Sequence, residues 1–171
     1  MLISLTSADR GQSLALMDIL KKSITHNKVT FFITELTKTS APGKNCKEII
    51  LPAFEDKKLC VKYTLLHYLS RTKTLRGGRM RLFISFRKPH NTVTSATIAR
   101  WIRIVLNRVG IHGYGAHSTR SASTSLVCQA GLAVPIILKA ADWSKESTFT
   151  RFYRRAPDNS EFGRSVLQAR K

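Results

Sequence analysis

Acidic side chains are scarce in this sequence. Its 171 residues contain 10 Asp and Glu against 29 Lys and Arg, which gives a formal net charge of +19. An excess of this size opposes compaction by self-repulsion, so a polyanionic partner is expected. Nucleic acid is the first candidate for that partner, and an acidic membrane surface is the second.

Long apolar runs and paired cysteines are also lacking. No stretch approaches the ~20 apolar residues of a membrane span, and no basic segment followed by an apolar one opens the chain. The membrane alternative is therefore weak, and we expect a protein that is not secreted, nuclear in a eukaryote and cytoplasmic otherwise. Cys46, Cys60 and Cys128 form no CxxC pair, so reduced thiols are expected. The five histidines are scattered along the chain, and we expect neither a metal site nor a cofactor.

Repeats and low-complexity segments are absent too, and the local patterns predict a mainly helical α+β domain with a small antiparallel sheet. Strands are expected over residues 28–36 and 47–54, which would form a hairpin, and over 82–85. In two of the expected helices, apolar residues at helical spacing predict core positions, among them Leu59 and Tyr63 in the first and Trp101 in the second. The expected helices cover residues 8–19 (capped by Ser7), 58–72, 94–110, 117–131, 133–142 and 145–155.

The segment AHSTR contains the first residues that point to chemistry. His117 and Arg120 are three apart at the start of an expected helix, which places both on one face. Free N–H groups at that end of a helix also favour an anion. The motif alone is common by chance, but Trp143 follows in AADWS, and Tyr153 stands ten residues later among several arginines.

A tyrosine in such surroundings fits the metal-free cutting and rejoining of DNA. The reaction needs a nucleophile, cations directed at the non-bridging phosphate oxygens, and an acid that protonates the leaving sugar oxygen. Arginine suits the second task because its planar guanidinium can bind two phosphate oxygens at once. A phosphotyrosine intermediate would conserve the phosphodiester energy, so resealing would need no cofactor.

The run GAHSTRSASTSLVCQAGLAVPIILKAADWSKESTFTRFYRR resembles the C-terminal half of a tyrosine recombinase (phage-integrase family) catalytic domain. Its AADWSKESTFTRFY portion is most similar to the recombinase-like genes of eukaryotic mobile elements of the DIRS type. The family signature is Arg, Lys, His-x-x-Arg, His or Trp, and then Tyr. The resemblance covers nearly the whole chain: LTSADRGQSLALMDI assigns Arg10, and ITELTKTS assigns Lys38.

The resemblance implies a role for each signature residue. Arg10 and Arg120 would hold the non-bridging oxygens of the scissile phosphate. Tyr153 would attack the phosphorus, giving a 3′-phosphotyrosine and a free 5′-hydroxyl. Lys38 would be the general acid, with Lys44 and Lys47 as competing candidates.

The two remaining positions complete this set. His117 would assist proton transfer or bind the phosphate. Trp143 replaces the more usual histidine, and its indole N–H can donate one hydrogen bond but cannot shuttle a proton. Packing in the core and a hydrogen bond in the site both remain open for Trp143.

Some features depart from the family pattern. The interval from Trp143 to Tyr153 is one residue longer than the commonest spacing, and ADWS replaces the frequent GHxS. We expect residues 1–156 to form the catalytic domain and 157–171 a tail or short helix, with the N-terminal core-binding domain absent. Two other functions therefore remain open: a DNA-binding relic that does not cut, and relaxation of DNA by a type IB topoisomerase.

Double-stranded DNA is the expected partner, and the resemblance implies self-association on it as a tetramer. Basic residues outside the signature are candidates for contacts with the DNA backbone, although such a run is also typical of a solvated face. These candidates are Arg76, Arg79, Arg81, Arg87, Lys88, Arg151 and Arg154.

Overall fold

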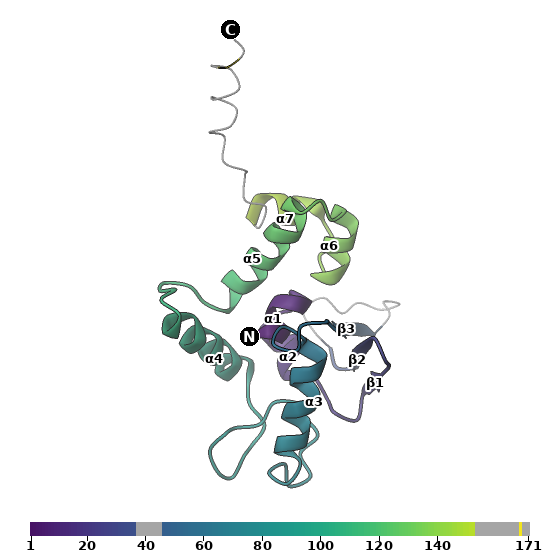
Figure 1. The fold of residues 1–171 in the computed structure, drawn as a ribbon, viewed down its shortest axis with the longest axis vertical. Coiled ribbons are helices and arrows are strands. Elements are labelled where there is room, and N and C mark those ends of the chain that lie inside the picture. The colour runs from purple at the N-terminus through teal and green to yellow at the C-terminus, as the bar shows by residue number, and fades with distance from the viewer. Residues whose placement is uncertain (37–45, 153–167, 169–171) are drawn as a thin grey trace.

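The computed structural model describes residues 1–36, 46–152 and 168, and helices dominate these segments (Figure 1). The predicted class, mainly helical α+β with a small antiparallel sheet, is confirmed. Within the described residues, no helix combines the length and the apolar character that a membrane span requires. The elements in chain order are α1 (Leu2–Ser7), α2 (Gly11–Ala15), β1 (Lys22–Ile24), β2 (Lys28–Ile33), β3 (Lys47–Pro52), α3 (Val61–Thr72), α4 (Ser95–Arg108), α5 (Ala116–Gln129), α6 (Val134–Ala140) and α7 (Glu146–Phe152).

The N-terminal region contains two short helices where the sequence predicted one. Ala8 adopts a left-handed conformation (φ 52°) and ends α1, and Arg10 is extended and caps α2. Ser7 was expected to begin a helix, but it is the last residue of α1, and its hydroxyl accepts a hydrogen bond from the Asp9 amide (3.2 Å). The prediction was wrong because a left-handed residue interrupts the helical hydrogen bonds at this point.

The sheet has the strand order β1-β2-β3, with both pairs antiparallel. Phe31 of β2 lies opposite Lys22 of β1 on one side and Ile49 of β3 on the other. Burial alternates along β3, where Ile49 and Leu51 face the core, as expected of a sheet with one wet face. The sequence missed β1, whose three residues are too few to show an alternating pattern.

Two hydrophobic clusters hold these elements together. The larger one joins α2, the sheet, α3 and α4 through residues such as Leu14, Phe31 and Ile98. The smaller one contains Ala8, Ile137, Ala141, Trp143 and Phe149. Figure 1 shows α5, α6 and α7 gathered at one end of the domain, with α1 between them and α3.

Two predicted core faces were wrong in detail. On α3, Val61 and Leu65 are buried, whereas Leu59, just before the helix, and Tyr63 are more than half exposed. The sheet packs against the face of α3 that carries Val61 and Leu65. Helical spacing alone does not show which face of a helix a neighbouring element will cover. On α4, Ile98 and Ile102 are likewise buried, whereas Trp101 is only half-buried. The strand expected over residues 82–85 is reduced to isolated bridges, one at Arg81 just before it and one at Ile84 within it.

Candidate active site

Three of the predicted site residues line one cavity. Arg10, at the start of α2, meets His117 and Arg120, from the first turns of α5, around a space of about 590 Å³. The rest of its wall comes from the α1–α2 junction, from the first residues of α2 and α5, and from the N-terminal part of α4, including Ser95 and Ala99. Residues that are far apart in the sequence thus share one concave surface.

Contacts between helices bring Arg10 to this cavity. The Arg10 carbonyl accepts the amide of Leu14 (3.1 Å) and so begins α2, which packs against α4. Gly11 lies against the backbone of Ser95, where an added Cβ would sit 3.5 Å from the carbonyl oxygen. The half-buried Arg10 is therefore placed at the α2–α4 contact, beside the start of α5.

The start of α5 is fixed by its own cap and by α1. The Ser118 hydroxyl accepts the amide of Gly115 (3.3 Å), and the buried hydroxyls of Ser4 and Thr119 are 2.9 Å apart. His117 is exposed, whereas Arg120, three residues later, is only 1% exposed. The cavity thus has one accessible imidazole and one buried guanidinium on the same helical face.

The α6–α7 link contacts the Arg120 guanidinium and limits its motion. Its Nη2 donates a hydrogen bond to the Ala141 carbonyl, and its guanidinium carbon lies 4.4 Å from the centre of the Trp143 ring. Trp143 is 8% exposed and packs at 5.7 Å on Phe149 of α7. The structure shows the packing role of Trp143, since the indole contacts Arg120 and Phe149 and is not part of the cavity lining, and its hydrogen bond in the site stays a prediction.

Asp9 is a buried carboxylate that the sequence interpretation missed. Its side chain is 2% exposed, lines the same cavity and pairs with Lys47 of β3, which in turn lies 3.5 Å from Asp142. Burial raises the pKa of Asp9 above its ordinary value, and the nearby charges of Lys47 and Arg120 oppose that rise. Its position next to Arg10 in ADRG was the only available sequence signal.

Other predicted residues fall outside the described part of the chain. Tyr153, Lys38 and Arg154 belong to this group, as does Lys44, one of the alternatives to Lys38. α7 comes directly before Tyr153 in the sequence and is anchored by Phe149, which is fully buried against Trp143. Among residues 1–36 and 46–152, no three His, Cys, Asp or Glu side chains gather as a metal site would need.

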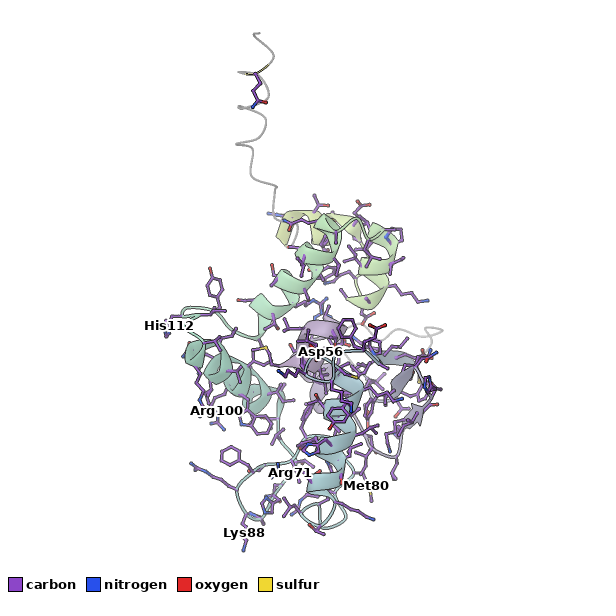
Figure 2. All side chains as sticks on the ribbon, in the orientation of Figure 1. Asp56, Arg71, Met80, Lys88, Arg100 and His112 are labelled. Carbon is purple, nitrogen blue, oxygen red and sulfur yellow. The ribbon has the colours of Figure 1, made fainter. Side chains whose placement is uncertain are left out.

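The basic residues expected to contact DNA divide by environment. Arg87, Lys88 and Arg151 are exposed, and the side chain of Lys88 extends away from the body of the domain in Figure 2. Arg79 and Arg81 are half-buried. Arg79 donates a hydrogen bond to the side-chain oxygen of Asn91 (2.7 Å), and Arg81 donates one to the Leu16 carbonyl (2.7 Å).

Arg76 differs from the others. It is 6% exposed and donates hydrogen bonds to the Arg81 carbonyl (2.7 Å), the Leu82 carbonyl (2.8 Å) and the Thr72 hydroxyl (2.8 Å). Its guanidinium also lies 5.6 Å from the centre of the Tyr68 ring. These contacts make Arg76 a support of the loop after α3, and they leave it covered by protein.

No protein-family model matches this chain, and no curated protein does. Solved structures match almost all of it. The XerA recombinase superposes with a TM-score of 0.70 and 20% identity, over 99% of this chain and 55% of XerA. The XerH site-specific recombinase bound to its palindromic difH substrate gives 0.69 and 19%, over 98% and 44% of the two chains. The Tn1549 transposon integrase with circular intermediate DNA gives 0.63 and 11%, over 96% and 55%.

This chain therefore spans about half the length of the structures it matches. The match includes the helices that carry Arg10, His117 and Arg120, and the sheet beside them, since nearly the whole chain is aligned. The fold implied by the sequence resemblance is thereby confirmed. The chain has the fold of a tyrosine recombinase catalytic domain.

Proposed function

We propose that this domain cleaves and rejoins DNA strands through a covalent 3′-phosphotyrosine, in site-specific recombination of a mobile element. The observation that carries the proposal is the meeting of Arg10, His117 and Arg120 at one cavity. Cationic and imidazole groups of this kind suit the cleavage of a phosphodiester, because the transition state of that reaction carries extra charge on the non-bridging oxygens.

The nucleophile in this proposal is Tyr153. Its phenolic oxygen attacks the phosphorus, the bond from phosphorus to the 5′ oxygen breaks, and the strand end stays on the enzyme. The 5′ oxygen takes a proton from Lys38 and leaves as a hydroxyl, while the phenolic proton passes to His117 or to water. Rejoining is the reverse reaction, with a 5′-hydroxyl as the nucleophile.

Arg120 and Arg10 act on the non-bridging oxygens. The burial of Arg120 supports this role, because a preorganised cation in a low-dielectric site interacts more strongly with a phosphate than an exposed one does. Its contacts with Ala141 and Trp143 limit its motion, so little reorganisation is needed when the phosphate arrives. The exposed His117 can reach a substrate that approaches from solvent.

The DNA itself is bound by the basic surface. The exposed side chains of Arg87, Lys88 and Arg151, together with Arg154, contact the phosphate backbone, and the half-buried Arg79 and Arg81 contribute to the same binding. We leave Arg76 out of this interface because its guanidinium is bonded within the protein. The XerH and Tn1549 structures are complexes with DNA, which supports double-stranded DNA as the partner here.

Three further parts of the proposal depend on the resemblance. The AADWSKESTFTRFY segment points to a mobile element of the DIRS type, and hence to the nucleus of a eukaryotic host. Self-association as a tetramer on paired DNA sites would let strands be exchanged through a Holliday junction. The catalytic domain would cover residues 1–156.

The test is a covalent trap. The protein is incubated with nicked duplexes of randomised sequence, denatured in detergent, and examined for a slowly migrating protein–DNA band, with and without excess chelator. We expect a chelator-resistant band that disappears in Tyr153→Phe. Tyr63→Phe is the matched control, because Tyr63 is exposed on α3 and the same hydroxyl is removed. Sequencing the trapped DNA then identifies the cleaved site.

Other outcomes would redirect the assignment. A protein that binds the duplex but forms no band in any condition would be a DNA-binding relic. A band accompanied by relaxed circles, with no strands joined between partners, would indicate a type IB topoisomerase. A band that persists in Tyr153→Phe would refute the proposed nucleophile.

A further inference from the structure

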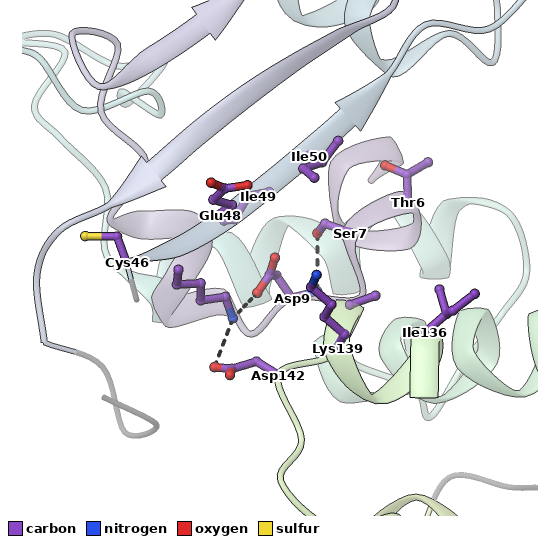
Figure 3. Close-up of a pocket in the computed structure, with 12 residues that line it drawn as sticks. Thr6, Ser7, Asp9, Cys46, Glu48, Ile49, Ile50, Ile136, Lys139 and Asp142 are labelled. Atoms are coloured by element: carbon purple, nitrogen blue, oxygen red, sulfur yellow. Dashed lines mark hydrogen bonds and ion pairs between the residues drawn. The ribbon is translucent and has the colours of Figure 1, made fainter. Parts of the chain in front are cut away.

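A cation between two carboxylates joins three elements beside the candidate active site. Lys47 begins β3, Asp9 lies in the α1–α2 junction, and Asp142 lies in the α6–α7 link. The Lys47 ammonium pairs with an Asp9 oxygen and lies 3.5 Å from an oxygen of Asp142, as the dashed lines in Figure 3 mark. The three side chains are 14%, 2% and 15% exposed, so the cluster is largely withdrawn from water.

Asp9 connects the cluster to Arg10. It directly precedes Arg10, and both residues line the 590 Å³ cavity. The left-handed Ala8 and the bond from the Asp9 amide to the Ser7 hydroxyl define the path of this segment. A displacement of Asp9 would therefore move the residue that caps α2.

Asp142 connects the cluster to Arg120. It stands between Ala141, whose carbonyl accepts a hydrogen bond from Arg120, and Trp143, whose ring stacks on Arg120. Asp142 itself is left-handed (φ 51°), a conformation that aspartate adopts more readily than most residues but at some cost. Its ion pair with Lys47 is a contact from outside the link that favours this turn.

Lys47 itself does not line the cavity of Arg10 and Arg120. It lies in a neighbouring cavity of about 540 Å³, together with Asp9, Asp142 and Lys139. With two carboxylates next to it, its ammonium is committed to the protein. These features fit a residue that positions its neighbours better than a proton donor. The sequence alone had left Lys47 as an alternative to Lys38 for the role of general acid.

We propose that Lys47 is a positioning residue: through Asp9 and Asp142 it holds Arg10 and Arg120 at the separation that a phosphate requires. Lys47 also pairs with Ile33 at the end of the β2–β3 pair where the two strands are connected, so it links these strands to both arginines. This inference rests on the proposed function for its catalytic consequence, but the link between Lys47 and Arg120 can be measured without catalysis.

The catalytic test compares Lys47→Met, Lys47→Arg and Lys38→Met on the duplex recovered by the covalent trap. In Lys47→Met we expect cleavage at saturating DNA to slow by up to about 100-fold, the loss that follows a misplacement of reacting groups by about 1 Å. DNA affinity should change little, and Lys47→Arg should restore most of the rate. Lys139→Met is the control, since it removes an exposed lysine of the same cavity.

A second substrate separates positioning from proton donation. When sulfur replaces the bridging 5′ oxygen, the leaving thiolate needs no proton, so loss of a general acid is rescued. We expect Lys38→Met to recover on this substrate and Lys47→Met to stay slow. Recovery of Lys47→Met, or a wild-type rate on the oxygen substrate, would overturn the positioning role.

The second measurement needs no activity. The measurement is the Nε–H signal of Arg120 in ¹⁵N-labelled protein, assigned by its loss in Arg120→Met, which the ring current of Trp143 should shift because the ring centre lies 4.4 Å from the guanidinium carbon. We expect this signal to shift or broaden in Lys47→Met and to stay unchanged in Lys139→Met. An unchanged signal in Lys47→Met would refute the positioning of Arg120 by Lys47, even if wild-type protein forms no covalent adduct. If Lys47→Met does not fold, Asp142→Asn breaks the same link while the pair with Asp9 remains.

Discussion

Replacing Trp143 by alanine measures how strongly the indole supports Arg120. The side chain is 8% exposed, and its ring contacts both Phe149 and the Arg120 guanidinium. Truncation of a buried aromatic residue to alanine costs about 3–5 kcal/mol of unfolding free energy, a value that includes the cavity left behind. Since small domains have about 5–15 kcal/mol in total, Trp143→Ala should leave a marginally stable protein.

The part of this loss that comes from Arg120 can be isolated. A desolvated cation–π contact is worth about 2 kcal/mol, so a double-mutant cycle of Trp143→Ala with Arg120→Met should give a coupling of that size. Trp143→Phe should lose less than Trp143→Ala, because it retains a ring against both neighbours.

Urea unfolding followed by circular dichroism provides these free energies. Trp101→Ala is the matched control, because the same truncation is made at a half-buried tryptophan that packs on Phe86. It should cost less and show no coupling to Arg120→Met. A loss below about 1 kcal/mol for Trp143→Ala, typical of an ordinary substitution, or a coupling near zero, would refute the supporting role.

Three further predictions concern burial and charge. Arg76→Met should lower the unfolding free energy by about 3 kcal/mol, because it removes charged hydrogen bonds to buried acceptors; a loss in urea unfolding no larger than that of the exposed Arg87→Met would contradict this. Burial raises the pKa of Asp9, so this carboxyl contributes stability that is present at pH values below its unfolded pKa and lost as the pH rises through its folded pKa. Asp9→Asn should therefore lose this pH dependence, so that the stability of the wild type falls relative to that of the variant as the pH rises from about 4 to 7, and a difference that stays constant over this range would count against it. DNA affinity should fall steeply with salt, by a slope of about 0.9 per phosphate neutralised in a log–log plot, and a flat titration would argue against backbone binding.

The sequence predicted those features that depend on local spacing. The three-residue interval between His117 and Arg120 places both on one face of a helix wherever that helix lies, and both residues line the cavity. Most helices were located correctly, as was the hairpin, because 3.6-residue and two-residue periods are visible along the chain. The roles of Tyr153 and Lys38 remain predictions, since both residues lie outside the described segments.

Only the tertiary structure decided which residues face one another. The sequence does not show that Lys47 lies between Asp9 and Asp142, or that Arg76 is buried while Arg87 is exposed. The same holds for the packing of Trp143 against Arg120, which no local pattern indicates. Spacing fixes neighbours within a helix or strand, whereas burial and ion pairing depend on distances between segments that are remote in sequence. The physical reason is that these distances are set by packing of the whole chain, and no local pattern encodes them.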